Sequence, residues 1–440
     1  MSIVKIQGHA SGTGTLTVTA PNTSTNRTLT LPDTTGTLLD ENSSVPAANL
    51  TGTVADARIS ALTASKLTGA LPAISGASLT GIAGGRRNII INGAMQVWQR
   101  ATAATAATTG FQTVDRWKTY HGSDGAYTLE QSVLSVADRA TTGCTNALLA
   151  QCTTVDASLA ADQYAYIVQP IEAQNLSHIG YGAAGAKDLT LSFWVKKGTI
   201  ANGSTFSVAL KKFDSNYYSY QQYTIDSDNW ERKTLTYPGL TAAGITTSDN
   251  TTGAEVRFIL ATGSNYHGTV NTWSTNATEQ STASQFNFLS NTSNDFYITG
   301  VQLEVGSVAT DFEHRSYGEE LALCQRYFEI YGDGKVSDYA LMAIGANWTT
   351  TNSRAFLQWQ VEKRAAPTVT EAGTWYIRNH EGSSGGVSTK QFDNPSKEGT
   401  SLVITAASAV LVAGNTAMIW LQGSASATQG DRGVYVDAEL

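Results

Sequence analysis

The segment Ser316-Tyr-Gly-Glu-Glu-Leu-Ala-Leu-Cys-Gln-Arg-Tyr-Phe328 decides how this chain divides into domains. Ser316 and Glu319 have the spacing of a capping box, in which each side chain accepts a hydrogen bond from the backbone N–H of the other residue. Leu321, Cys324 and Phe328 then follow at the spacing of one helical face. The pattern predicts a short helix, and it is the only clear helix signal in the sequence.

The residues before this helix alternate as a strand does. Val301, Leu303 and Val305 are separated by polar residues, and the polar segment 306–315 connects them to Ser316. A strand that closes one domain, followed by a helix that opens the next, indicates a domain junction. The alternative is a helix at the edge of one larger domain.

Composition favours a β-rich protein. The 440 residues carry a net charge of −8, and only 15% of them are charged, while Gly, Ser and Thr are abundant. The negative charge argues against nucleic acid or an anionic membrane as the partner. Three cysteines without a Cys-x-x-Cys pair argue against a disulfide framework or a zinc site. The sequence also offers neither an apolar leader nor an apolar run of membrane-spanning length.

The N-terminal part differs from the rest, because residues 1–97 contain no Phe, Tyr or Trp. A single chain of this composition has too little apolar area to offset the entropy of ordering it. Leu-Thr-Gly units at 50–52, 67–69 and 79–81 indicate short segments wound around an axis shared between chains. We therefore expect residues 1–85 to form a fibrous shaft that is ordered only in an oligomer, with a flexible linker as the alternative.

From Arg86 onward, short alternating runs are separated by Gly, Asn, Ser and Thr. Strands are expected at residues 164–169, 189–195, 205–210, 256–260 and 297–305, and a buried strand with its continuation at 88–93 and 95–98. Within 189–195 the apolar positions define a core face, so Thr190, Ser192 and Lys196 are expected to face solvent. The pattern predicts an antiparallel sandwich or jelly roll over residues 86–315.

After a linking helix at residues 316–329, the same pattern returns. Strands are expected around 355–361, 374–378, 402–405, 418–421 and 434–440. They predict a second β-sandwich over residues 330–440. The expected fold class is therefore mainly β: an N-terminal fibrous shaft, then two antiparallel β-sandwich, jelly-roll-like domains joined by a short helix.

The residues at the two junctions resemble a known family. Residues 87–100 (Arg-Asn-Ile-Ile-Ile-Asn-Gly-Ala-Met-Gln-Val-Trp-Gln-Arg), Asp115-Arg-Trp117 and 301–328 closely resemble tail fibre proteins of tailed bacteriophages, of the cyanophage and marine podophage type. Residues 28–37 and 435–440 resemble the shaft and last strand of the same proteins. The resemblance implies a homotrimer in the virion tail, bound through its N-terminus to tail adaptor or nozzle proteins, with a middle domain similar to carbohydrate-binding modules. It implies no ligand pocket, because these motifs mark the scaffold.

No catalytic motif is visible. The six histidines include no His-Glu-x-x-His, no Walker A loop occurs, and no Gly-x-Gly-x-x-Gly follows directly after a predicted strand. Asp226 and Asp228 have the chemistry of a glycosidase pair, but beside Asn229 and Trp230 they fit a turn better. We expect no enzyme, no cofactor and no metal. A fibre with glycan depolymerase activity remains a third alternative.

Surface aromatics are the better clue to binding, since sugar C–H faces stack on Trp and Tyr while the hydroxyls need polar partners. The candidate carbohydrate-binding residues are Trp375, Tyr376, Arg378 and His380, before the Gly/Ser-rich loop 382–387, and Tyr217, Tyr218 and Tyr220. Each also fits a structural role, because alternation buries half the aromatics of any strand. Trp98, Arg100, Asp115, Arg116 and Trp117 are better interpreted as a core aromatic cluster with an Asp–Arg pair.

These observations favour a trimeric, non-enzymatic phage tail fibre that adsorbs to host cell-surface polysaccharide. Residues 330–440 are expected to read the receptor, because a fibre anchored by its N-terminus presents its far end to the host. The main alternative is a structural virion appendage, such as a head fibre or decoration, without specific receptor binding.

Overall fold

The computed structural model describes residues 11–14, 17, 24–26, 86–212, 216–242, 249–276, 279–331, 339–379, 381–422 and 433–440. The chain forms two compact units, residues 1–83 and 84–440. The shaft expected at residues 1–85 lies almost wholly outside the described residues, so it stays a prediction. Within the described part of the chain, no helix is long and apolar enough to cross a membrane.

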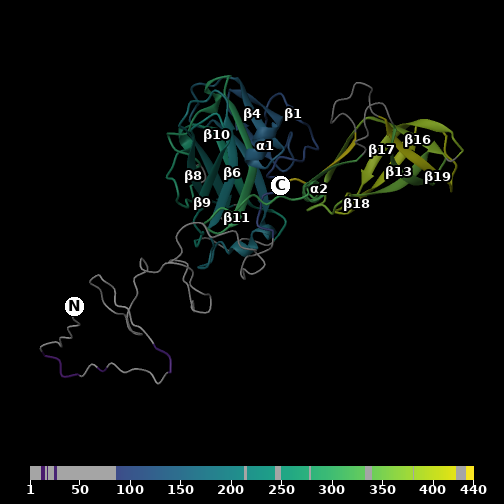
Figure 1. Ribbon diagram of the computed structural model, residues 1–440. Helices are drawn as coiled ribbons and strands as arrows, with labels where there is room; N and C mark the ends of the chain where they lie inside the picture. Colours follow the sequence, from purple (N-terminus) through teal and green to yellow (C-terminus); the bar gives the residue numbers. More distant parts are fainter. Residues whose placement is uncertain are drawn as a thin grey trace. The chain divides into compact units, whose positions relative to one another are not determined.

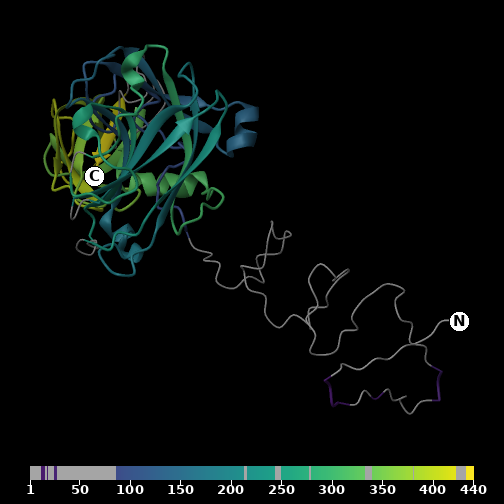
Figure 2. The ribbon, with the colours of Figure 1, turned by 90° about the vertical axis from the view of Figure 1, so that its left-hand side faces the viewer.

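The larger unit begins with a sandwich of two antiparallel sheets (Figures 1 and 2). The six-stranded sheet has the order β1 (Ala103–Ala104), β3 (Ala126–Val133), β4 (Asn146–Thr154), β11 (Asp295–Val305), β6 (Leu189–Lys197) and β9 (Glu231–Tyr237). The five-stranded sheet has the order β2 (Lys118–Gly122), β5 (Tyr164–Glu172), β10 (Thr252–Thr262), β7 (Ser204–Lys212) and β8 (Tyr217–Ile225). The middle of the chain is thus an antiparallel β-sandwich, as the alternating pattern predicts.

Aromatic side chains join the inner faces of the two sheets. Phe193 of β6 meets Phe258 of β10 edge-on, with ring centroids 5.1 Å apart, and both rings are fully buried. The ring centroids of Phe206 of β7 and Phe296 of β11 are 5.4 Å apart. Burial of each such ring contributes about 1.5–3 kcal/mol to folding. The core of the sandwich is therefore the one that the alternation of residues 189–195 predicts.

Strand β6 is buried on both faces, which corrects one prediction. Thr190 and Ser192, expected in solvent, are buried, and Lys196 is half-buried. The segment after β11 covers this face: the hydroxyl of Thr190 donates to the carbonyl of Gly306 at 2.6 Å. Buried polar groups need such partners, and here the backbone of a connecting segment supplies them instead of water. The polar residues that alternate along β6 therefore lie on a face that is covered by protein and not by solvent.

Residues 88–98 are buried but form no strand, so the strand predicted there is wrong. Asn92, with a φ of 57°, organises the segment instead. Its Oδ1 accepts from the N–H groups of Gln96 (2.8 Å) and Val97 (3.0 Å), and its Nδ2 donates to the carbonyls of Val97 (2.9 Å) and Asp115 (3.0 Å). The side-chain amides of Asn92 and Gln169, with two backbone hydrogen bonds to β11, thus take the place of a regular strand ladder, which the apolar run alone does not reveal.

Helix α2 (Tyr317–Gln325) confirms the predicted helix, and its Ser316–Glu319 capping box is complete. Phe328 is not part of it, because this residue opens strand β12 (Phe328–Tyr331). The buried side chains of α2 are Glu320 and Cys324, and Glu320 accepts a hydrogen bond from the N–H of Asn92 at 2.5 Å. The helix is therefore tied to the sandwich by a polar contact as well as by packing.

A second helix, α1 (Val136–Thr142), was not predicted. Ser135 caps its N-terminus and Gly143 ends it in the left-handed conformation, so its seven residues carry both boundary signals but too few turns for an apolar period. Short 3-10 helices occupy Ala173–Asn175, Ser177–Ile179, Ser264–Tyr266 and Phe288–Ser290. All three cysteines are buried free thiols.

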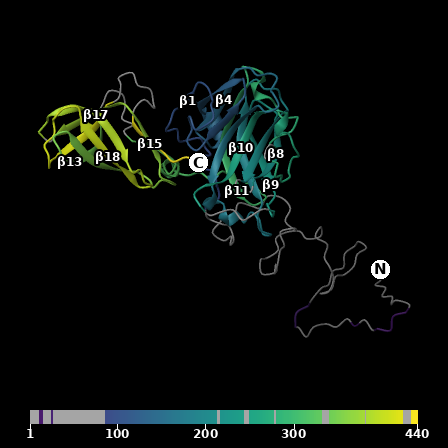
Figure 3. The same ribbon diagram turned by 180° about the vertical axis from the view of Figure 1, so that it is seen from behind.

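The strands after α2 form a closed barrel and a small sheet, where a second sandwich was predicted (Figure 3). The barrel order is β13 (Tyr339–Asn347), β14 (Asn352–Gln358), β18 (Gly399–Ala406), β17 (Ser384–Asp393), β16 (Thr374–Asn379) and β19 (Thr416–Gln422). The small sheet has the order β12, β20 (Gly433–Asp437) and β15 (Thr368–Ala372). Alternation is the same in a sandwich and a barrel. Closure depends on β13 pairing with both β14 and β19, which no local pattern encodes.

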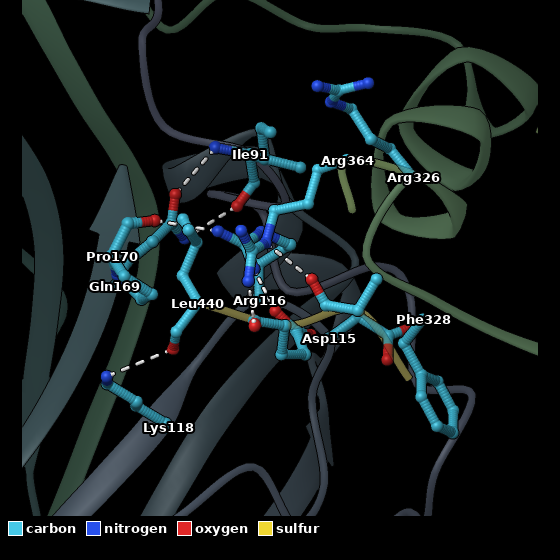
Figure 4. A network of polar contacts seen from close by, with 12 residues as sticks. Ile91, Asp115, Arg116, Lys118, Gln169, Pro170, Arg326, Phe328, Arg364 and Leu440 are labelled. Carbon is cyan, nitrogen blue, oxygen red and sulfur yellow. Dashed lines mark hydrogen bonds and ion pairs between the residues drawn. The ribbon is translucent and has the colours of Figure 1, made fainter. Parts of the chain in front are cut away.

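The end of the chain binds the sandwich through a charged network (Figure 4). The guanidinium of Arg116, only 1% exposed, pairs with Glu439, donates to the carbonyl of Pro170 at 2.8 Å and lies 3.4 Å above the ring of Tyr327. Arg364 donates to the carbonyls of Ala438 and Glu439, at 2.6 Å each. We call the pairing of residues 438–440 with this site the C-terminal clasp.

The cluster predicted around Trp98 and Trp117 lies next to the clasp. Both rings are buried, and Arg100 pairs with Asp115 at 3.2 Å, as expected. Burial is the largest influence on Asp115 and raises its pKa to about 7, although Arg100 acts in the opposite direction. The resemblance motifs at residues 87–117 are therefore structural: they hold the chain end against the sandwich.

Candidate functional site

A cavity with polar and aromatic lining opens on the outside of the barrel, where β16 lies between β17 and β19. Tyr376 of β16 lies directly opposite Trp420 of β19, and both rings are half-buried. Arg378, two residues further along β16, lies opposite Ser384 of β17. With Gly382 these residues line a cavity of about 490 Å³, which we call the barrel cavity.

A buried asparagine shapes the turn beside this cavity. Asn379 accepts from the N–H of Ser383 at 2.9 Å and donates from its side chain to the carbonyl of Val410 at 3.0 Å. Gly382 follows with a φ of 92°, a conformation that other residues adopt only with strain. A Cβ there would approach the Arg378 guanidinium to 3.5 Å. Arg378 is exposed and lines the cavity beside Gly382.

The structure separates the residues predicted in this region. Tyr376 and Arg378 line the barrel cavity, whereas Trp375 is 3% exposed, belongs to the barrel core and donates to Glu371 at 2.9 Å. His380 lies outside the described residues. Residues 384–387, expected in a loop, begin strand β17, so the connecting turn is shorter than predicted.

Trp420 is the residue that sequence reasoning missed. Ala417, Ile419 and Leu421 of β19 are buried, so the alternation of this strand places Met418 and Trp420 on the outer face. That signal was present in the sequence. The sequence did not reveal which residue lies beside Trp420, because the pairing of β19 with β16 joins it to Tyr376, 44 positions earlier.

Tyr217, Tyr218 and Tyr220 do not form an exposed platform. Tyr217 packs against the inner core of the sandwich, and Tyr218 and Tyr220 are buried on the outer face of the five-stranded sheet. The backbone of Tyr218 exchanges two hydrogen bonds with Ser274, at 2.9 and 2.8 Å, so residues 271–276 cover this edge. Asp226 and Asp228 lie in the connection between β8 and β9, as the turn interpretation predicts.

Other tyrosines of the same outer face line a hollow: Tyr164 and Tyr266 are half-buried, and Tyr166 is 3% exposed. Tyr164 and Tyr166 of β5 stack with centroids 5.1 Å apart, and Tyr266 meets the Tyr164 ring edge-on at 5.6 Å. Together with neighbouring side chains they surround a hollow of about 280 Å³, which we call the tyrosine hollow. Its lining consists of Tyr120, Tyr164, Tyr166, Lys211, Arg257, Tyr266 and Gln280.

Charged groups follow one end of the tyrosine hollow. The fully buried Glu255 lies 2.6 Å from Arg257 and 3.1 Å from Lys118. Burial, the largest single influence, acts to raise the pKa of Glu255, but these two cations outweigh it and hold the pKa below its usual range. Burial and the nearby Arg257 and Lys118 lower the pKa of Lys211 to about 8, against the attraction of Glu255. Cations therefore crowd this end.

Comparison with known proteins gives weak matches. No protein-family model and no curated protein matches the chain. Among solved structures, a family 61 carbohydrate-binding module in complex with β-1,4-galactotriose matches at 12% identity over 50% of this chain and 99% of that chain, with a TM-score of 0.25. The N-terminal cellulose-binding domain of a β-1,4-glucanase from Cellulomonas fimi matches at 11% identity (48% and 98% covered, TM-score 0.23).

A cyclase from Fischerella sp. TAU matches to a similar extent, at 11% identity over 47% of this chain and all of that chain, with a TM-score of 0.26. Several neighbours are thus carbohydrate-binding modules, but not all. TM-scores of this size carry no functional assignment. The function therefore has to be argued from the chain's own residues.

Proposed function

We propose that this protein is a carbohydrate-binding adsorption protein whose barrel cavity receives the sugar. The observation that carries the proposal is the cross-strand pair Tyr376–Trp420 beside Arg378 in a cavity of about 490 Å³. Two aromatic side chains offer faces for sugar C–H groups, and the guanidinium and the Ser384 hydroxyl offer hydrogen bonds to ring hydroxyls. A cavity of this volume accommodates a mono- or disaccharide.

We further propose the biological setting implied by the residues at 87–117 and 301–328: a homotrimeric tail fibre of a tailed phage. In this proposal residues 1–85 attach to the virion tail, and the barrel binds host cell-surface polysaccharide. Three copies would present three equivalent cavities, so weak single-site affinities combine through effective concentration. Millimolar single-site binding then suffices for adsorption.

Exposed apolar side chains on the barrel support self-association. Ile344 of β13 and Phe356 of β14 are each 63% exposed, and Leu341 is 48% exposed. Side chains of this size on neighbouring strands are unusual on a monomer and mark contact surfaces.

Sedimentation velocity should give three times the monomer mass for the full chain. A Phe356→Ser, Ile344→Ser variant should dissociate more readily on dilution, and a monomeric full chain would contradict the trimer.

Sugar binding is tested with point variants of the full chain. Tyr376→Ala and Trp420→Ala should each weaken binding to an array of bacterial surface polysaccharides about tenfold, which corresponds to about 1.4 kcal/mol. Tyr317→Ala removes a 58% exposed tyrosine outside the cavity and is the matched control. Unchanged binding by both cavity variants, with unfolding midpoints equal to the unmodified protein, would remove the barrel cavity from the proposal.

A further inference from the structure

We infer that the tyrosine hollow on the sandwich is a second saccharide site, and that it takes acidic sugars such as uronic acids. Nothing in this inference depends on the barrel cavity, because the two sites share no residue. It rests on the shape of the hollow, on its ring arrangement and on the charges at one end.

The rings supply a sugar-binding wall. Tyr164 is half-buried and stacks on Tyr166, at an interplanar angle of 21°, while Tyr266 stands nearly perpendicular to both, at 76° and 82°. These contacts hold the three rings in one arrangement without a ligand. A preformed aromatic wall loses little conformational entropy on binding, which favours affinity for a small, rigid ligand such as a pyranose.

Two polar side chains that line the hollow are also held in place by hydrogen bonds. Arg257 donates from Nη1 to the side-chain oxygen of Gln280 at 2.9 Å and from Nε to Glu255 at 2.7 Å. Gln280 in turn donates to the hydroxyl of Tyr166 at 3.4 Å. The guanidinium is therefore held in place by its partners and cannot turn away from the hollow. Its positive charge acts on a ligand as a fixed field.

The charge balance at this end favours an anion. Lys118, Lys211 and Arg257 surround the carboxylate of Glu255, and Lys118 also contacts the Leu440 carbonyl oxygen at 3.4 Å. Another nearby carboxylate, that of Asp162, acts on Tyr266. Glu255 is already paired with Lys118 and Arg257. This locally positive end belongs to a chain whose net charge is −8. The local charge at this end is therefore opposite in sign to the net charge of the protein.

Lys211 and Arg257 are the two cationic side chains that line the hollow. The Lys211 amine lies 5.2 Å from the ring centre of Tyr218. Burial and repulsion from Arg257 and Lys118 lower its pKa to about 8, which means that its charged form is partly destabilised. A bound anion would relieve that destabilisation. A neutral sugar would not, so the site discriminates by charge as well as by shape.

The test compares acidic and neutral oligosaccharides on the full chain by calorimetry. Trigalacturonate should bind, and galactotriose of equal length should bind at least tenfold more weakly. Lys211→Met preserves length and volume and should reduce trigalacturonate affinity about tenfold while leaving galactotriose unchanged. Tyr164→Ala should weaken both. Tyr317→Ala, which removes a 58% exposed tyrosine outside both sites, should change neither.

Contrary outcomes are equally specific. Equal affinity for the two oligosaccharides, or trigalacturonate binding that survives both Lys211→Met and Tyr164→Ala in folded protein, would overturn the inference. Binding of a thymidine oligonucleotide as tight as trigalacturonate would also overturn it, because the hollow would then be a general anion site. Unfolding midpoints of each variant establish that the measured loss is local.

Discussion

Removing the carboxylate of Glu439 should loosen the C-terminal clasp. Glu439 is 5% exposed in its side chain and pairs with two guanidinium groups, those of Arg116 and, at 3.2 Å, Arg100. Glu439→Ala leaves the Arg116 charge buried beside the Pro170 carbonyl and the Tyr327 ring only. The perturbation therefore tests whether Glu439 stabilises the sandwich through Arg116, which lies 323 residues upstream.

The expected magnitude follows from burial. Breaking a buried ion pair by removing one partner costs about 3–5 kcal/mol. Because Arg116 keeps the Pro170 hydrogen bond and the Tyr327 ring, we expect the lower end, about 3 kcal/mol, for Glu439→Ala. Glu439→Gln keeps an oxygen acceptor, so about 2 kcal/mol is expected.

Urea unfolding of the full chain, followed by tryptophan fluorescence, measures these values. Hydrogen exchange at residues 113–118 shows whether the loss is local to the clasp. Asp393→Asn is the matched control, since Asp393 pairs with Arg354 at 3.6 Å and the Arg354 side chain is 58% exposed. Such an exposed pair contributes at most about 1 kcal/mol. If Glu439→Ala destabilises no more than Asp393→Asn, the reasoning from buried charge is refuted.

Three further predictions concern the sandwich. Burial raises the pKa of the Cys144 and Cys152 thiols, so iodoacetamide at pH 7.5 should label them only after unfolding. Replacing both with Ser should lower the free energy of unfolding by at most about 2 kcal/mol. A native Cys144–Cys152 crosslink found by mass spectrometry would contradict the expectation of two free thiols. Burial acts to raise the pKa of Glu172, but Arg326, at 2.9 and 3.0 Å, outweighs it and lowers the pKa below 4.5. Because the folded pKa is the lower one, the stabilisation is present above pH 4.5 and is lost as the pH falls through the folded value. The difference in unfolding free energy between the unmodified protein and Glu172→Gln should therefore be constant from about pH 6 to 8 and should shrink in acid. A difference that does not change with pH would exclude the ion pair as its source. Gly300→Ala should destabilise the protein by about 1–3 kcal/mol, since φ is 60° and a Cβ would lie 2.9 Å from the Trp194 side chain. Gly203→Ala is the control for backbone strain alone, because φ is 77° and a Cβ there would meet open space. Equal losses of stability for the two variants would show that the Trp194 contact costs nothing.

Part of the candidate site was predictable. The composition of residues 375–380 pointed to a sugar platform, and Tyr376 and Arg378 do line the barrel cavity. Trp375 looked equally suitable, yet it fills the barrel core. Adjacent residues of a strand point to opposite faces, and only the packing of the barrel decides which face is inside. Tyr218 and Tyr220 failed for another reason: residues 271–276 cover their edge of the sheet.

Two elements of this fold are encoded by neighbouring residues in the chain. The Ser316–Glu319 capping box specified α2, and the period of two in residues 189–195 specified β6 and its core face. These features depend on neighbours within a few residues, so local backbone chemistry is enough to encode them.

The pairing of distant strands, by contrast, follows from the packing of the whole chain. Closure of the barrel requires β13 to pair with β19, about 75 positions later, and the barrel cavity exists because Tyr376, Ser384 and Trp420 come from three different strands. The clasp likewise joins Arg116 to Glu439. Such pairings are selected by the burial and charge balance of the whole folded chain, and alternation in one strand is compatible with many partners.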